Sequence, residues 1–121
     1  MERRTFEVGV EHFDGPIDLL LHLVKSRELE ISRISLAQVA SQYLAYVEMM
    51  KGEELEVAAE YLVVAATLLS IKASFLLKQP SEFAEEEDSL PDPQKELLAR
   101  LREAEIYKDG AEALGAVKQL G

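Results

Sequence analysis

Residues 54–78 constrain the fold of this chain more than any other feature, because they predict one long helix that is apolar on two sides. An ordinary surface helix has an apolar arc of only about 100°, which faces the core. Here a single narrow polar stripe interrupts the apolar surface, and it consists of Glu56, Glu60, Thr67, Ser70, Ser74 and Lys78.

The two apolar faces of this helix are separate stripes. The first contains Leu55, Ala59, Leu62, Ala66, Leu69, Ala73 and Leu76. The second contains Val57, Tyr61, Val64, Leu68, Ile71 and Phe75. One stripe can pack on the rest of the chain, whereas the other is covered either inside a compact bundle or by a partner. We favour a partner, because the remaining chain is short.

The rest of the chain predicts a small, mainly α-helical domain. Residues 5–13 alternate apolar and polar side chains, which indicates a short strand or extended arm. Asp14 is a candidate N-cap for a helix over residues 16–27, whose apolar arc of roughly 200° predicts that it is covered on two sides. Ser35 is a candidate cap for a helix over residues 36–51, which Gly52 ends.

Composition changes sharply after residue 79. Residues 80–93 hold six acidic side chains, three prolines and no basic residue, which predicts a flexible acidic linker. A helix over 94–108 and a weaker one over 111–119 follow, and they either fold back or dock on a partner. We therefore divide the chain into an N-terminal domain (1–79), the linker (80–93) and a C-terminal helical arm (94–121).

Composition also excludes several classes of function. The 121 residues carry a net charge of −10, which argues against a broad grip on nucleic-acid phosphates or on acidic lipids. The absence of cysteine excludes disulfides, thiol nucleophiles and cysteine-based zinc sites. We see no signal peptide and no uninterrupted apolar run of the ~18 residues that a membrane span needs, so we predict a cytoplasmic protein.

No motif for catalysis, cofactor binding or metal binding is recognisable. The sequence has no phosphate-binding glycine loop, and its only histidines, His12 and His22, have no ligand spacing that we can defend. We predict no enzyme activity, no cofactor and no metal. The alternative from another class is a self-contained helical DNA-binding regulator, but the long helix offers only Lys72 as an interior cation.

A family resemblance begins at residue 13. The stretch Phe13-Asp14-Gly15-Pro16-Ile17-Asp18-Leu19-Leu20-Leu21-His22-Leu23 resembles the F-x-G-P-L-D-L-L-L-x-L signature of segregation and condensation protein A, the bacterial kleisin family ScpA. Further matches follow in order: Ile31 and Ile34, then Gln42-Tyr43-Leu44, then Ala58, Glu60, Leu62, Ala65, Ala66, Leu69, Ile71, Lys72, Leu76 and Leu77. Ile17, Ala73 and Lys78 depart from the usual pattern.

The resemblance implies a non-catalytic subunit of the bacterial SMC–ScpA–ScpB condensin complex, which acts in chromosome condensation and segregation. In this family the N-terminal domain packs on the coiled-coil neck of one SMC subunit, and a ScpB dimer holds the middle region. A C-terminal winged-helix domain, which is not in this sequence, would bind the other SMC head. The resemblance implies no direct contact with nucleic acid or membrane, and association with the nucleoid through the complex.

Site residues follow from combining the resemblance with the helix pattern. For the SMC neck we predict the second apolar face: Val57, Tyr61, Val64, Leu68, Ile71 and Phe75. The inward face would then be Leu55, Leu62, Ala66, Leu69 and Leu76, although the pattern alone does not assign the two faces. For ScpB we predict Leu97, Leu101, Tyr107 and Leu114.

Overall fold

The computed structural model describes residues 13–52, 57–78 and 89–120, with side chains as far as residue 114. These residues form four helices and no strand: α2 (Pro16–Ser26), α3 (Arg33–Gly52), α4 (Ala59–Leu77) and α6 (Asp92–Leu120). The predicted mainly α-helical class is therefore confirmed. Residues 5–12 of the predicted strand and 80–88 of the predicted linker lie outside the described residues, whereas Phe13 is not in a strand and the last two linker residues, Asp92 and Pro93, belong to α6.

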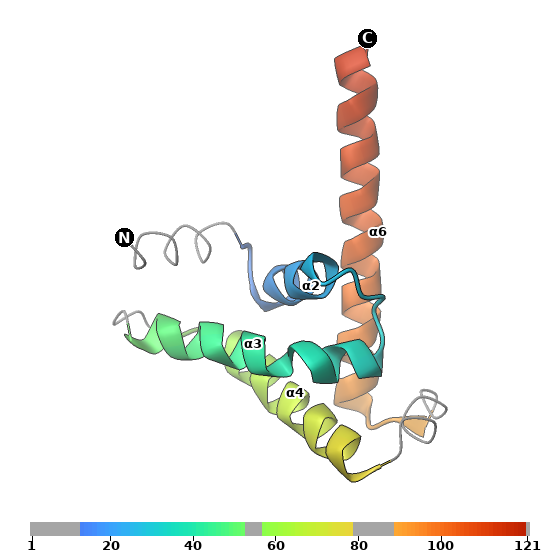
Figure 1. Cartoon of the computed structure of the whole chain (residues 1–121). Coiled ribbons are helices and arrows are strands. Elements are labelled where there is room, and N and C mark those ends of the chain that lie inside the picture. Colours follow the sequence, from blue (N-terminus) through green and yellow to red (C-terminus); the bar gives the residue numbers. More distant parts are fainter. Residues whose placement is uncertain (1–12, 53–56, 79–88, 121) are drawn as a thin grey trace.

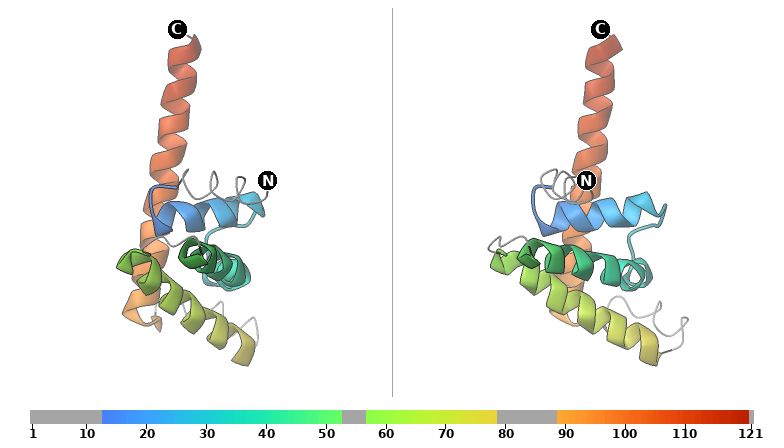
Figure 2. Two further views of the ribbon diagram at one scale, coloured as in Figure 1. Left: turned by 90° about the vertical axis from the view of Figure 1, so that its left-hand side faces the viewer. Right: turned by 60° about the vertical axis from the view of Figure 1, so that its left-hand side comes forward.

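The four helices form a small bundle with one projecting arm (Figure 1). α2 and α3 lie side by side, and α4 packs obliquely along the other side of α3 (Figures 1 and 2). The first half of α6 runs across these helices and contacts both α2 and α4. Its second half continues past α2 and away from the bundle.

α2 is covered on two sides, as its wide apolar arc predicts. It packs on both α3 and α6. Its buried side chains are Pro16, Leu19, Leu20, Leu21, Leu23 and Val24. They join buried side chains of the other three helices in one core, so the described residues fold around a single apolar interior.

The start of α2 differs from the prediction that Asp14 is its N-cap. Gly15 is the N-cap, with a φ of +149° and ψ of −176° that side chains rarely tolerate. Asp18 in the first turn accepts the backbone N–H of Asp14 at 3.1 Å. Glycine is required here because the chain must turn sharply into Pro16, whose fixed φ suits the first helical position.

The start of α3 lies three residues earlier than predicted, because Ser32 and Ser35 cap the helix together. The Ser35 N–H donates to Ser32 Oγ at 3.1 Å, and the Ser32 N–H donates to Ser35 Oγ at 3.0 Å. This is the reciprocal arrangement of a capping box, with serine in place of the usual glutamate. Ser35 therefore lies inside the first turn, and the prediction that it precedes the helix is wrong.

α6 is one continuous helix where the sequence predicted two. Gly110 lies inside it, at a position where no neighbouring atom comes within 4 Å of an added Cβ. Leu97, Leu98 and Leu101 are buried in the same core as α2, α3 and α4. The core therefore continues beyond the predicted domain boundary at residue 79, and the first half of α6 folds back on the N-terminal helices.

Candidate docking surfaces

The inward side of α4 is the apolar face that the sequence analysis assigned to a partner. Val64, Leu68 and Ile71 are buried, and the latter two are 0% exposed. Val57, Tyr61 and Phe75 are half-buried against the same core. These six side chains thus pack in or against the core of the chain itself. The assignment of this face to the SMC neck is corrected accordingly.

The outward side of α4 is the apolar face that was predicted to point inward, and that prediction is wrong. Leu62, Leu69 and Leu76 are 48%, 52% and 71% exposed. Ala59, Ala66 and Ala73 are also exposed. We call these six residues the Leu/Ala stripe. Leu55, the remaining member of the predicted inward face, lies outside the described residues.

The Leu/Ala stripe has the spacing of a coiled-coil seam. Its leucines are seven residues apart, its alanines are seven residues apart, and the two sets alternate at steps of three and four. This heptad pattern lets side chains of one helix insert between those of a facing helix. Small alanines at every second seam position allow the facing helix to approach closely. The stripe therefore has a spacing that is compatible with packing against a second helix.

Polar contacts hold α4 in the rotation that turns this stripe outward. The Tyr43 hydroxyl of α3 donates to the backbone carbonyl of Tyr61 at 2.9 Å. Lys72 Nζ donates to Ser41 Oγ of α3 at 2.7 Å. Burial raises the pKa of Tyr43 well above its usual range, which keeps the hydroxyl protonated and able to donate.

The sequence contained a signal that distinguishes the two faces of α4. A globular core needs side chains of varied shape that fill an irregular space, and the buried face supplies valine, leucine, isoleucine and aromatic rings. The exposed face is instead a strict repeat of two residue types, which is the pattern of a helix that pairs with another helix. Amphipathicity alone does not reveal this difference, because both faces are equally apolar.

Hydropathy sets α4 apart from the other described helices. By length and composition it is the one helix in the described residues that could cross a membrane, with a mean hydropathy of 1.6, and 22% of that window is buried. Core packing of Val64, Leu68 and Ile71 accounts for one side of the helix. Apolar side chains remain exposed beyond the Leu/Ala stripe, including Val63 and Leu77, which are 65% and 85% exposed.

The residues predicted to bind ScpB divide into two groups. Leu97 and Leu101 lie on the side of α6 that faces the bundle, and both are buried in the core. They hold the first half of α6 on the bundle, so their assignment to a partner is corrected. Tyr107 and Leu114 are 80% and 66% exposed on the projecting half. Ile106, which the sequence analysis did not single out, is exposed beside Tyr107.

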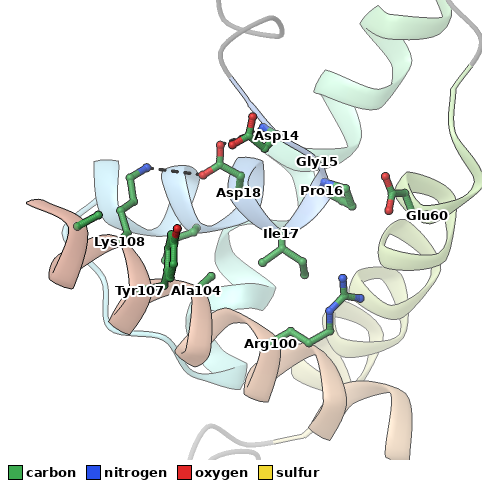
Figure 3. Close-up of a pocket in the computed structure, with 12 residues that line it drawn as sticks. Asp14, Gly15, Pro16, Ile17, Asp18, Glu60, Arg100, Ala104, Tyr107 and Lys108 are labelled. Carbon is green, nitrogen blue, oxygen red and sulfur yellow. Dashed lines mark hydrogen bonds and ion pairs between the residues drawn. The ribbon is translucent and has the colours of Figure 1, made fainter.

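A groove of about 540 Å³ lies between the start of α2 and the middle of α6 (Figure 3). Asp14, Asp18 and Glu60 supply carboxylates around it, and Arg100 and Lys108 of α6 supply cations. Lys108 pairs with Asp18 at 3.6 Å, and the apolar atoms of the wall come from residues such as Ile17 and Tyr107. The charges at this groove thus join α6 to α2.

The described residues contain no cluster of three histidine, cysteine, aspartate or glutamate side chains that could hold a metal ion. His22 is an exposed residue in the middle of α2, and its ring contacts that of Phe13 with centroids 5.0 Å apart and the ring planes tilted by 54°. His12, the other histidine, lies outside the described residues.

Comparison with known proteins identifies the family. The family model for segregation and condensation protein ScpA matches residues 23–119, well over half of the chain. The chain belongs to the ScpA family. The family model thus spans the end of α2 from residue 23, all of α3 and α4, and α6 as far as residue 119, which includes the Leu/Ala stripe and nearly all of the projecting half of α6.

Curated ScpA relatives agree with the family model. The protein named segregation and condensation protein A from Bacillus licheniformis is 48% identical over 112 residues, which cover 90% of this chain and 45% of the relative. Those of Bacillus pumilus and Bacillus subtilis are 47% and 46% identical, each covering 90% of this chain and 44% of the relative. The chain therefore spans less than half the length of these ScpA proteins, whose name refers to segregation and condensation.

Proposed function

We propose that this chain is a non-catalytic kleisin subunit of a bacterial SMC–ScpA–ScpB complex, and that the Leu/Ala stripe of α4 packs on the coiled-coil neck of SMC. The observation that carries the proposal is the exposure of Leu62, Leu69 and Leu76 in heptad register on a helix whose opposite side is already buried. Membership of the ScpA family supports the choice of an SMC neck as the partner.

The energetics of such a contact are favourable. Burying a leucine side chain completely stabilises a contact by about 1.5–3 kcal/mol. Leu62, Leu69 and Leu76 are 48%, 52% and 71% exposed, so about half or more of that gain is still available at each. A two-stranded neck presents heptad seams of its own, so α4 can join its helices in a small bundle.

The projecting half of α6 is proposed as the second contact, with a ScpB dimer. Tyr107 and Leu114 are exposed on a helix that has no core to cover them in the described residues, and Ile106 adds apolar surface beside them. An amphipathic helix laid into a groove is a common mode of recognition. The chain would then act in the cytoplasm, joined to the nucleoid through its partners, without contacting DNA itself.

Size-exclusion chromatography with light scattering tests the neck contact. The chain is mixed with an SMC head that carries a short neck coiled coil, and co-elution at the summed mass is expected. Leu69→Glu should abolish co-elution and leave the helical circular dichroism unchanged, because Leu69 is exposed. Met49→Glu is the matched control, since Met49 is an exposed apolar residue of α3, and this variant should still bind.

Leu68→Glu completes the series. Leu68 is adjacent to Leu69 in the sequence but is fully buried, so a carboxylate there should unfold the domain. Binding that survives Leu69→Glu would contradict the proposed neck contact. Salt-sensitive binding of duplex DNA by the isolated chain, with no co-elution with SMC, would instead favour a DNA-binding regulator.

The ScpB contact has a separate test. Tyr107→Glu and Leu114→Glu should each weaken binding to a ScpB dimer in isothermal titration calorimetry, because each places a charge in the proposed apolar contact. Both variants should bind the SMC neck normally. Equal affinity of both variants and the unmodified chain for ScpB would exclude this part of α6 as the contact.

A further inference from the structure

Gln94, in the first turn of α6, joins three helices through one buried side chain. It is 2% exposed, and its Oε1 accepts the Nε–H of Arg33 in the first turn of α3 at 3.0 Å. Its Nε2 donates to Ser70 Oγ of α4 at 3.1 Å. Arg33 is itself 5% exposed. Burying a polar side chain costs free energy unless it forms hydrogen bonds. These two hydrogen bonds therefore favour a single position for the first turn of α6 on the bundle.

Two ion pairs join α6 to α2 at a second place, near the point where α6 leaves the bundle. Lys25 at the end of α2 pairs with Glu105 at 2.6 Å, and Asp18 at the start of α2 pairs with Lys108 at 3.6 Å. The pairs have opposite polarity, so exchanging their partners would bring like charges together. Exposed pairs of this kind stabilise little, but they disfavour the wrong orientation.

Between these two sets of contacts, Leu97, Leu98 and Leu101 bury the underside of α6 in the core. The helix then continues without interruption to Leu120. The residues that leave the bundle are helical on both sides of the last ion pair, and the helix continues through Gly110 without a break (Figure 1).

We infer that α6 is a rigid arm, seated by Gln94, that holds the projecting half of the helix at a fixed orientation to the Leu/Ala stripe of α4. This inference rests on the proposed function, because it concerns how the two proposed contacts are placed relative to each other. A ScpB dimer on α6 and an SMC neck on α4 would then be held in one geometry by the folded chain, independently of the acidic segment between the helices. Gln94 is a positioning residue in this arrangement.

Pulsed electron spin resonance between two spin labels tests the arm directly. The chain has no cysteine, so Ala73→Cys on α4 and Ala113→Cys on α6 create two labelling sites at exposed positions without removing a native thiol. The free chain should give one narrow distance distribution. Gln94→Met, which keeps the volume but removes both hydrogen bonds, should broaden the distribution or add a second peak.

Gln94→Glu is the matched control. Its carboxylate can accept from Arg33, and the Ser70 hydroxyl can donate to it, so the narrow distribution should return. Hydrogen exchange gives a second readout, because amide protection over residues 97–101 should fall in Gln94→Met and recover in Gln94→Glu. Circular dichroism of each variant checks that the total helix content is retained.

Either of two results would overturn the inference: a broad distribution in the unmodified chain, or a narrow one in Gln94→Met. Neither result bears on the neck contact, which is measured by co-elution with SMC. Conversely, a narrow distribution in the labelled chain together with failure of the unlabelled chain to bind SMC would leave the rigid arm standing and remove the proposed function.

Discussion

Tyr43 shows how a single polar atom supports the orientation of α4. Its ring is fully buried in α3, and its hydroxyl reaches the carbonyl of Tyr61 across the helix interface. Rotating α4 so that the Leu/Ala stripe turned inward would break this bond and leave a buried hydroxyl unpaired. The family-like Gln42-Tyr43-Leu44 stretch could be read from the sequence, but the partner of the hydroxyl depends on how two helices pack.

We predict that Tyr43→Phe lowers the free energy of unfolding by about 1 kcal/mol at neutral pH, the usual net contribution of one hydrogen bond. Burial raises the folded-state pKa of Tyr43 above its unfolded value of about 10. Stability of the unmodified chain should therefore decline as the pH rises above about 10, where only the unfolded tyrosine loses its proton.

Urea unfolding at neutral and alkaline pH measures both effects. Tyr43→Phe should show a flatter alkaline decline than the unmodified chain, because it lacks the titrating group. Tyr107→Phe, at an exposed tyrosine, is the control and should change neither quantity. An equally steep alkaline decline in Tyr43→Phe would show that another group is responsible.

At the scale of single elements, the positions of the helices along the chain could be predicted better than their caps or which of their faces are buried. The apolar periodicity located α2 and most of α3 and α4. It missed the capping of α3 because Ser32 and Ser35 form a capping box without the expected glutamate. It reversed the two faces of α4 because each is apolar over a similar arc, and only the seven-residue repeat separates them. In α6, the pattern predicted two helices, over 94–108 and 111–119, where the structure has one.

Gly110 provides a test of α6 as an element. An alanine in a helix interior is more favourable than glycine by about 1 kcal/mol, and the site has space for the added methyl group. Gly110→Ala should therefore increase amide protection around residues 105–114. It should leave the global unfolding midpoint almost unchanged, because this half of α6 lies outside the core.

Ala113→Gly is the reciprocal control and should lower protection in the same segment, since Ala113 is an exposed helical residue. Hydrogen exchange with mass spectrometry resolves this segment from the core. Identical protection in the unmodified chain and both variants would mean that the segment is not helical in solution.

At the scale of the whole molecule, the fold buries one side of its most apolar helix and exposes the other. α2, α3 and the first half of α6 supply enough apolar surface for Val64, Leu68 and Ile71, and the Leu/Ala stripe stays outside. The sequence predicted an uncovered face from the shortness of the chain. It could not predict that residues 94–104 fold back, because their leucines suit a core and a partner equally well.

The most direct test of the Leu/Ala stripe as the neck contact is thiol footprinting along α4. Single cysteines replace Leu62, Leu69 and Leu76 in this cysteine-free chain, with Met49→Cys as the control. Their alkylation rates are measured with and without an SMC head that carries its neck. The account predicts that the three stripe cysteines become protected in the complex while the cysteine at position 49 does not. Stripe cysteines that react as fast in the complex as in the free chain would contradict it.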